Sequence, residues 1–300
     1  MRTFDQNEYI SITMHFRCNL KCVHCMIEGT MDRLKPQSAA QLSELLKENA
    51  QTRKWKGLIL SGSEVTLHAD LPKWAKMAKE SGFEHVRIQT HGMKLANKNY
   101  CKELVDAGVD EFFISVTASD AATHDAITGV PGSFHKTMQG LENLESFDNA
   151  ISLTNTVVTS LSYQHLPEMV RLLRPFQRLA QMEFWVFWPM HEKDNKNLIV
   201  SHLEVLPFLR EAVSLAQLAK RRLEVKNFPE CLLGKDREIL NNDQPETLVD
   251  PKFWPEFWRS GWNQCAHREQ CGSVKCMGLT KAYIEKFGWH TNELSPYPCG

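Results

Sequence analysis

The sequence predicts an α/β fold in which parallel strands form a barrel-like sheet, followed by a small cysteine-rich C-terminal region. Six strand-like segments alternate with helix-like ones, and most strand starts lie roughly 25 to 40 residues apart, the span of one βα unit. Repeated βα units imply parallel strands joined by right-handed crossovers. Five of the nine cysteines follow Pro229. We therefore expect two regions, residues 1–200 and 201–300.

The six expected strands are runs rich in β-branched and aromatic residues. They are Tyr9 to Phe16, Gly57 to Ser61, His85 to Thr90, Glu111 to Thr117, Ala150 to Val158 and Met182 to Phe187. Helix signals lie between them. Ser38 and Gln41 form a capping-box pattern. Asp70 opens a second helix that Gly82 closes, and a third is expected over 97–107.

Beyond the sixth strand the sequence changes character. The charged stretch His191 to Asn197 is expected to be a surface linker or a loop over the site. The start of the next helix is ambiguous, because Ser201 is typical of an N-cap whereas Pro207 prefers a first turn. The segment Asn241 to Pro255 is expected to be loop-rich. Three tryptophans are expected to bury the seam between the two regions: Trp254, Trp258 and Trp262.

Composition narrows the class of protein. With 300 residues and 42% hydrophobic content, the chain is long enough for one large domain, alone or with a small appendage. It has no apolar signal core at its start and no run of about 18 apolar residues, so a cytoplasmic protein is expected. Lysine plus arginine (35) nearly balances aspartate plus glutamate (36), which argues against nucleic acid and membranes as partners. Nine cysteines in a reducing compartment favour metal or redox chemistry over disulfides.

A cysteine triplet directly follows the first expected strand. Cys18, Cys22 and Cys25 have the spacing C-x3-C-x2-C, and runs this short let thiolates converge on an iron-sulfur cube. A four-iron cluster held by three protein thiolates keeps one iron open for an exogenous ligand. The alternatives are a zinc site and an unligated cysteine cluster. Zinc fits poorly, because it favours paired knuckles that add to four ligands.

This spacing resembles the signature of the radical S-adenosylmethionine (SAM) enzymes, in which an aromatic-type residue precedes the last cysteine; here that residue is His24. The resemblance implies an incomplete (β/α)6 TIM-like barrel with SAM bound at the open iron. It also implies reductive cleavage of SAM to a 5'-deoxyadenosyl radical, which takes hydrogen from a small-molecule or peptide substrate. The electron would come from an external flavodoxin- or ferredoxin-type donor. Oxidation, epimerisation and bond formation all stay open as outcomes.

The end of the second expected strand supplies candidate SAM contacts, since ligand sites of such sheets lie at the carboxyl ends of the strands. Gly62, Ser63 and Glu64 resemble the family's Gly-Gly-Glu-Pro element, whose backbone and carboxylate hold the SAM amino group. Ser63 replaces the second glycine and Val65 replaces the proline. Gly62 and Glu64 nevertheless stay in register, so the backbone approach and the negative charge are expected to be kept.

Other strand ends carry weaker candidates. The resemblance implies that Thr90, Ser115 and Asn155 contact the methionine carboxylate or the ribose of SAM. The alternative for each is an ordinary polar residue satisfied by the backbone. His91, alone in a loop, is expected to be solvated. The stretch from His124 to Phe134 also resembles family sequence and is interpreted as structural.

A second cysteine group lies in the tail. Cys231, Cys265, Cys271 and Cys276 loosely resemble the auxiliary-cluster tails called SPASM or twitch, which implies a second [4Fe-4S] cluster saturated by four thiolates. A structural zinc on the same four cysteines is the alternative. A spare Cys231 or Cys299 is a candidate hydrogen-atom donor to a substrate radical.

Other hypotheses about the function stay open. One is a non-catalytic iron-sulfur or zinc protein on a degenerate barrel; another is transfer of the aminocarboxypropyl group of SAM. Nucleic-acid modification would require a basic surface. Only eight residues precede the first strand, which favours a small metabolite over a peptide without excluding a peptide delivered by another protein. Cys101, on the apolar stripe of its expected helix, is expected to pack in the core.

Overall fold

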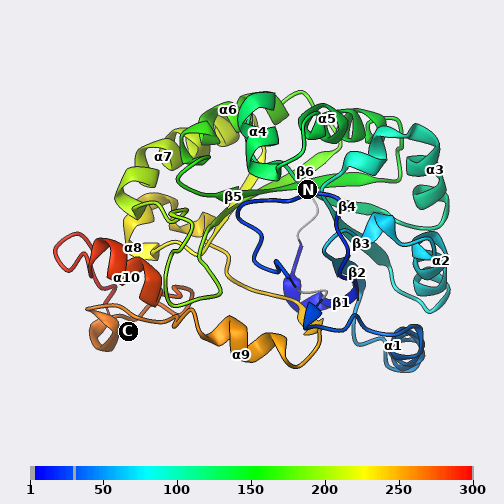
Figure 1. Cartoon of the computed structure of the whole chain (residues 1–300), viewed down its shortest axis with the longest axis horizontal. Helices are drawn as coiled ribbons and strands as arrows, with labels where there is room; N and C mark the ends of the chain where they lie inside the picture. The colour runs from blue at the N-terminus through cyan, green and yellow to red at the C-terminus, as the bar shows by residue number, and fades with distance from the viewer. Residues whose placement is uncertain (1–3, 30–31, 299–300) are drawn as a thin grey trace.

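A single parallel sheet of eight strands organises the protein. The computed structural model describes residues 4–29 and 32–298. The strand order is β7-β6-β5-β4-β3-β2-β1-β8, and every neighbouring pair is parallel. The strands are β1 (Tyr9–His15), β2 (Gly57–Gly62), β3 (His85–Thr90), β4 (Glu111–Ser115), β5 (Ile151–Val158), β6 (Leu179–Val186), β7 (Arg222–Lys226) and β8 (Glu246–Leu248). The sheet curves into a partial barrel whose two edges are β7 and β8 (Figure 1).

All six expected strands are confirmed, with ends that differ by a few residues, and the α/β partial-barrel prediction is correct. Two strands were missed. β8 has only three residues, too few for a periodic pattern, and it lies in the segment that was expected to be loop-rich. β7 and β8 both belong to the range 201–300 and pair with β6 and β1. The C-terminal third therefore extends the barrel sheet before it forms the cysteine-rich tail.

Helices cover the outer face of the sheet, as Figure 1 shows. The capping box of Ser38 is confirmed, and Asn97 caps the third helix through its side chain. Ser201 is the N-cap of the long helix after the sixth strand, so Pro207 lies inside that helix. The helices are α1 (Ala39–Thr52), α2 (Leu71–Glu80), α3 (Lys98–Asp106), α4 (Ala121–Thr128), α5 (Ser133–Leu144), α6 (Leu166–Leu173), α7 (His202–Leu218), α8 (Glu230–Leu233), α9 (Phe253–Trp258) and α10 (Lys281–Phe287).

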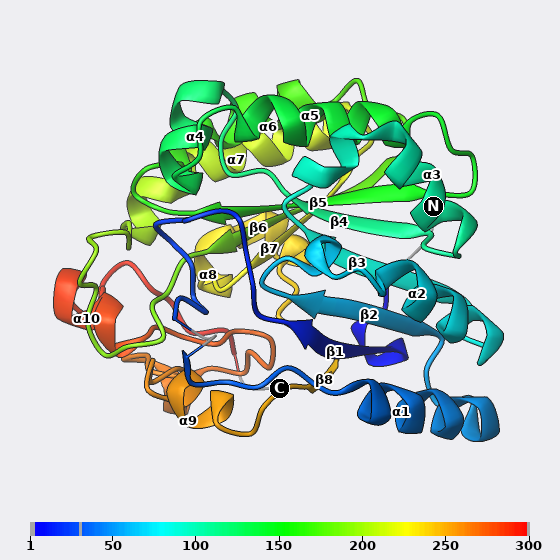
Figure 2. The same ribbon diagram turned by 45° about the vertical axis from the view of Figure 1, so that its right-hand side comes forward.

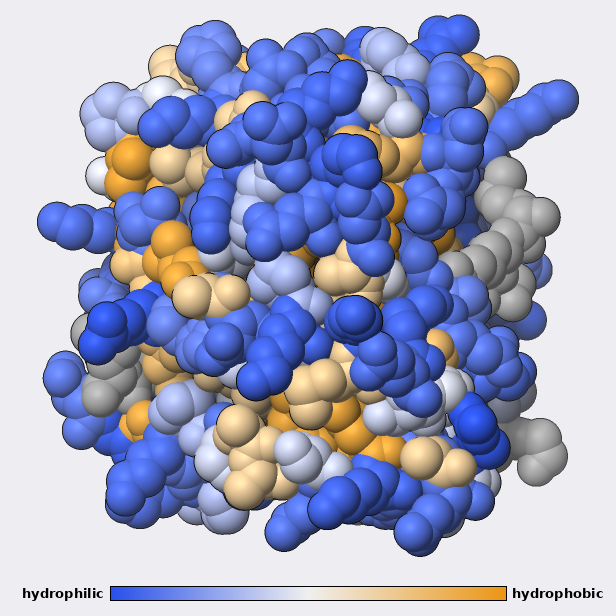
Figure 3. All heavy atoms as spheres, turned by 90° about the vertical axis from the view of Figure 1, so that its right-hand side faces the viewer, coloured by the Kyte–Doolittle hydropathy of each residue, from blue (hydrophilic) through white to orange (hydrophobic). Residues whose placement is uncertain are grey.

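The core lies between the sheet and these helices. Strand residues such as Ile12, Leu60, Ile88 and Ile114 are fully buried in one cluster with the apolar faces of the helices. Cys101 is buried in the same cluster, as expected. The outward faces of the helices are polar, and Figure 3 shows a mainly hydrophilic surface on the side that carries α1 to α3. The helices of the outer layer are therefore amphipathic, with an apolar face on the sheet and a polar face outward.

The inner face of the barrel differs from that of a closed TIM barrel, which is filled by branched apolar side chains. Only one small apolar cluster, made of Phe4, Phe113 and Leu153, forms apart from the main core among the described residues. Alternate strand positions carry polar residues instead, including Ser11 and Gln89. Because small and polar side chains do not fill the interior, the barrel contains cavities.

The seam between barrel and tail is only partly as expected. Trp262 packs against Trp188, with ring centroids 5.1 Å apart, and Phe257 packs on the same Trp188 ring at 5.0 Å. The prediction for the other two tryptophans is wrong: Trp254 and Trp258 are 38% and 60% exposed. Both lie on the short helix α9, and neither buries its ring in the seam. No helix in the described ranges is long and apolar enough to cross a membrane.

Candidate active site

A cavity of about 550 Å³ opens at the carboxyl ends of the strands. All three cysteines of the triplet line it, together with residues at the ends of β2, β3 and β4 and with Asn155 inside β5. Figure 2 shows the loop after β1 and the tail with α9 and α10 at this same end of the sheet. Of the residues expected to contact SAM, the cavity is lined by Gly62, Ser63, Thr90, Ser115 and Asn155.

The cysteine loop is anchored to the end of α4. Lys21 N–H donates to Thr128 O (2.8 Å), and Val23 N–H donates to Ile127 O (2.9 Å). Within the segment after β4, Asp125 has a structural role: it accepts hydrogen bonds from Gly132 N–H, Phe134 N–H and the Ser133 hydroxyl in the turn at the start of α5. This turn and α4 therefore form the platform on which the cysteine loop lies.

The thiols of the triplet stand in a partly buried setting. Burial raises the pKa of Cys22 to about 12, and the neighbouring Cys25 and Cys18 thiols add to the rise. Burial is also the main cause of the raised pKa of Cys18 and Cys25. The backbone N–H of Leu20 points at the Cys18 sulfur (3.3 Å). A metal cluster would therefore displace protons from three thiols that the protein by itself keeps neutral.

The tail cysteines come together in a separate, small and mostly apolar pocket. Cys231, Cys265, Cys271 and Cys276 all line it. Two of them show the same contact as Cys18: the N–H two residues on points at the sulfur of Cys265 (3.4 Å) and of Cys276 (3.4 Å). The structure thus brings together the four residues expected to act as one ligand set. Cys299 lies outside the described residues.

Neither cysteine group forms a tight cage for a single metal ion. Within residues 4–29 and 32–298, no three Cys, His, Asp or Glu side chains surround one point closely enough to hold such an ion. The thiolates of a four-iron cube each bind a different iron, so they line a cavity rather than converge on a point. The triplet, in a cavity and with a backbone N–H directed at sulfur, fits a cube.

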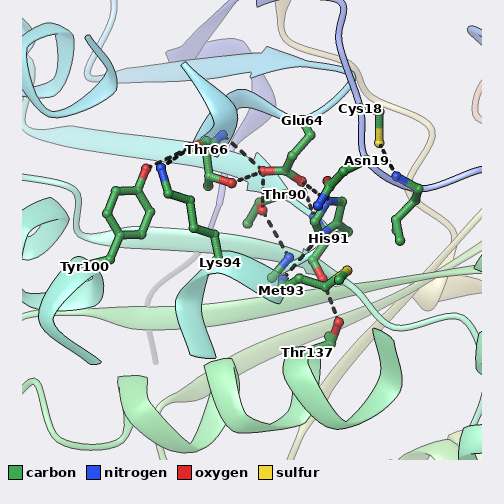
Figure 4. A network of polar contacts seen from close by, with 12 residues as sticks. Cys18, Asn19, Glu64, Thr66, Thr90, His91, Met93, Lys94, Tyr100 and Thr137 are labelled. Carbon is green, nitrogen blue, oxygen red and sulfur yellow. Dashed lines mark hydrogen bonds and ion pairs between the residues drawn. The ribbon is translucent and has the colours of Figure 1, made fainter. Parts of the chain in front are cut away.

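Glu64 stands apart from the other expected SAM contacts because its carboxylate does not line the cavity. It is fully buried and accepts hydrogen bonds from Thr66 N (3.0 Å), Thr90 Oγ1 (2.7 Å) and His91 N (2.8 Å), and from the Thr66 hydroxyl (Figure 4). The His91 ring approaches it at 3.1 Å. A carboxylate has about four lone-pair sites, so this network occupies its accepting capacity.

His91 is buried, so the expectation that it is solvated is wrong. Met93 N–H donates to its Nδ1 (3.2 Å), which places the ring proton on Nε2. Nε2 lies 2.7 Å from Oδ1 of Asn19, inside the cysteine loop, and 3.1 Å from the Glu64 carboxylate (Figure 4). Burial lowers the pKa of His91, more strongly than the nearby carboxylate raises it. A neutral ring therefore links the end of β2 to the cysteine loop.

Several buried polar atoms at the cavity lack a partner within the described part of the chain. They are His24 Nδ1, Thr117 Oγ1 and Asn155 Oδ1. All three residues line the cavity. Because a buried polar group without a hydrogen bond is costly, such atoms mark a place where a polar ligand completes the structure. SAM, with its amino, carboxylate and ribose groups, suits that requirement.

The end of β2 is shaped for close backbone approach. Gly62 has a φ of 155°, and a Cβ there would lie 1.9 Å from His15 O. Ser63 N–H donates to the same carbonyl (2.8 Å), and Glu64 N–H donates to Arg17 O (3.1 Å). The chain after β2 therefore lies directly on the backbone that leads into the cysteine loop.

The stretch His191 to Asn197 is a loop over the site, one of the two expected alternatives. Lys196 Nζ donates to Val23 O (3.1 Å) and forms an ion pair with Glu28, so this loop is tied to the cysteine loop. A groove of about 290 Å³ lies between the two loops.

Sequence reasoning missed Asn19, Gln89, His124 and Trp185 as parts of the site. Gln89, His124 and Trp185 line the cavity. Side chains two positions apart on a strand share one face, so Gln89 lies on the face of Arg87, and Trp185 on the face of Glu183. This alternation would have placed Gln89 and Trp185 on the inner face. No sequence signal marks Asn19, whose role depends on the approach of β3.

The fold and this cavity define an α/β-barrel protein with a polar, thiol-lined site at the carboxyl ends of the strands. The sequence model of the radical SAM superfamily matches residues 12–173. The chain belongs to that superfamily, whose members use a [4Fe-4S] cluster and SAM.

Curated relatives share this family but differ in the activities that their names state. The chain is 25% identical to Fe-coproporphyrin III synthase of Methanosarcina barkeri, over 77% of this chain and 56% of the relative. It is 33% identical to a probable GTP 3',8-cyclase of Methanopyrus kandleri, over 57% of this chain and 53% of the relative. The chain thus spans about half the length of these curated relatives.

Solved structures show the same fold. Streptococcus suis SuiB bound to its precursor peptide SuiA matches with a TM-score of 0.65 at 14% identity, over 94% of this chain and 76% of SuiB. Native anSMEcpe with bound AdoMet matches with a TM-score of 0.58 at 16% identity, over 72% of this chain and 63% of that one.

Proposed function

We propose that this protein reductively cleaves SAM and directs the resulting radical at a C–H bond of a substrate held in the barrel. The observation that carries the proposal is the shared cavity: three thiols and polar residues of four strands line one space of about 550 Å³. When bound there, the cluster and SAM supply a 5'-deoxyadenosyl radical. The protein's own task is to hold the reactants and to keep water away.

Cys18, Cys22 and Cys25 would hold the cluster. Gly62 and Ser63 would contact SAM, since both line the cavity beside the cysteine loop. Thr90, Ser115 and Asn155 would contact the polar groups of SAM. Ser115 and Asn155 are register partners on β4 and β5, so they present neighbouring polar atoms to one ligand.

The loop that carries Lys196 would shield the reaction. It is tied by hydrogen bond and ion pair to the cysteine loop, and the groove beside it is lined by residues of both loops. A primary carbon radical reacts with whatever lies near it, so exclusion of solvent is a requirement of this chemistry.

The tail would hold a second [4Fe-4S] cluster on Cys231, Cys265, Cys271 and Cys276. Their common pocket and the two N–H contacts to sulfur support this. Structural zinc is the alternative. Because Cys231 lies with the other three thiols, a ligand role suits it better than the role of hydrogen-atom donor.

The test is SAM cleavage. Protein reconstituted without oxygen is mixed with SAM and a strong reductant, and 5'-deoxyadenosine is quantified by chromatography. The proposal predicts 5'-deoxyadenosine from the wild type and none from the triple variant C18A/C22A/C25A. Methylthioadenosine as the main product would instead support aminocarboxypropyl transfer, and no cleavage by protein with a reduced cluster would support a non-catalytic role.

A further inference from the structure

A second cavity, of about 190 Å³, lies inside the barrel; we call it the inner chamber. Gln89, Phe113 and Trp185 line both this chamber and the larger cavity that holds the cysteine loop, so the two spaces adjoin. Gln6 and Gln244 line the chamber from segments that lead into β1 and β8. The function proposed above uses the larger cavity and leaves the inner chamber without a role.

The chamber contains a buried carboxylate without a cationic partner. Glu183, on β6, is 2% exposed and accepts hydrogen bonds from Gln181 Nε2 (2.7 Å) and Trp185 Nε1 (2.7 Å). Both donors are neutral. No Lys, Arg or His nitrogen of the described residues forms an ion pair with Glu183, and each of its oxygens keeps accepting capacity.

The chamber also contains a buried ammonium without an anionic partner. Lys226, on β7, is 2% exposed, and its Nζ donates to Asn241 O (2.8 Å) and Asp243 O (3.1 Å). An ammonium has three N–H donors, so one remains. Over the part of the chain that the structure describes, Lys226 has no carboxylate in ion-pair contact.

These two charges lie on adjacent strands but do not reach each other. The register places Lys226 opposite Trp185, two positions beyond Glu183. Leaving a charge buried and unpaired is costly. Burial raises the pKa of the neighbouring Glu224 and the charge of Glu183 raises it further, whereas Arg222 and Lys226 lower it. A ligand with one positive and one negative group would complete both sites.

Arg87 adds donors for the negative group. It is 2% exposed and lines the chamber, and its Nε donates to Glu111 (2.7 Å). Its Nη2 is buried without a hydrogen-bond partner in the described structure. A guanidinium has five N–H donors, so Arg87 can satisfy Glu111 and still donate to a carboxylate.

We propose that the inner chamber binds the zwitterionic end of a free α-amino acid, with its ammonium at Glu183 and its carboxylate at Lys226 and Arg87. The volume corresponds to about six water molecules, which is enough for this end and a short side chain. The rest of the molecule would extend past Gln89 and Trp185 toward the larger cavity. This inference rests on the proposed function, because it treats the amino acid as the substrate. An internal residue of a peptide would not suit the chamber, because it carries neither a free α-ammonium nor a free α-carboxylate.

Equilibrium binding of free amino acids tests the inference. Cluster-loaded protein without reductant is screened by thermal shift against the standard L-amino acids, and each hit is titrated by calorimetry. The same amino acid is then tested as its amide and as its N-acetyl derivative. We expect at least one free amino acid to bind, and each blocked form to bind at least about tenfold more weakly, because a charge-assisted contact is lost.

Two isosteric or near-isosteric variants, E183Q and K226M, should show the same loss of affinity for the free amino acid. E48Q, at an exposed glutamate on α1, is the matched control and should bind like the wild type. The comparison of blocked and free ligands uses wild-type protein, so it decides the question even where a variant folds poorly. Binding of no amino acid, or equal binding of the blocked forms, would overturn the inference.

The outcome is separable from that of the proposed function. Binding is measured without turnover, so an amino acid that binds to protein unable to cleave SAM would fault the proposed function alone. Cleavage of SAM by protein that binds no amino acid would fault the inner-chamber inference alone.

Discussion

The Nε2 atom of His91 lies 2.7 Å from Oδ1 of Asn19, which connects the end of β3 to the residue that follows the first cysteine of the triplet. The same ring lies 3.1 Å from Glu64. The position of the cysteine loop therefore depends on side chains at two strand ends, and not only on its own backbone.

Removing this contact should loosen the cluster site without unfolding the barrel. We expect H91A and N19A each to weaken SAM binding by about tenfold, or about 1.4 kcal/mol. Because the two residues share one hydrogen bond, the double variant should lose less than the sum of the two single effects. Calorimetric titration of SAM into the four proteins measures this coupling. Additive losses would contradict the link, and the exposed H135A is the control.

Glu64 should matter for the stability of the fold. Its carboxylate satisfies donors from Thr66, Thr90 and His91, and an amide at this position turns two N–H groups toward them. We expect E64Q to lower the free energy of unfolding by at least about 2 kcal/mol, measured by urea denaturation. E80Q, on the exposed side of α2, should change it by less than about 0.5 kcal/mol. A fully stable E64Q would show that the network is not needed.

The barrel should lose stability in acid through its buried histidines. Burial lowers the pKa of His202 to about 3, so the folded protein keeps this ring neutral while the unfolded chain binds a proton below its ordinary pKa of 6.5. The contribution of His202 to the free energy of unfolding is complete above pH 6.5 and falls as the pH drops from 6.5 toward 3. H202F should reduce the slope of unfolding free energy against pH by about 1.4 kcal/mol per unit near pH 4.5.

Urea denaturation of cluster-free protein at a series of pH values measures that slope. The ring of His202 stacks on Tyr283 with centroids 4.1 Å apart, and phenylalanine keeps this stack. An unchanged slope in H202F would show that His202 does not titrate in this window. The exposed variant H135N should leave the slope as it is.

A second cluster on the tail cysteines should be detectable in the number of irons per chain. With clusters on both cysteine groups, reconstituted wild type should contain about 8 irons per chain, and a variant with Cys231, Cys265, Cys271 and Cys276 changed to Ala about 4. Iron and zinc are determined by elemental analysis. If the variant instead loses one zinc and keeps its iron, the tail cysteines hold a structural zinc.

The sequence was most informative where chemistry and periodicity coincide. The triplet, the six long strands and the capping box of Ser38 are local patterns, and the structure has them where they were expected. The structure also gathers Thr90, Ser115 and Asn155 at one cavity, as parallel strand ends require.

The misses arise from contacts between distant segments. His91 was expected in solvent, but the approach of the cysteine loop buries it against Asn19, 72 residues earlier in the chain. β8 is a strand only because β1 offers it a free edge. The charges of the inner chamber lie on β3, β6 and β7, and no local pattern shows that three such strands face one space.

Electron paramagnetic resonance of the reduced protein, with and without SAM, tests the central claim most directly. If Cys18, Cys22 and Cys25 hold a cluster with an open iron, SAM should change the spectrum of the wild type. In C18A/C22A/C25A any remaining signal should come from the tail and should not respond to SAM. A wild-type spectrum that SAM leaves unchanged, or a response that survives in the triple variant, would contradict the account.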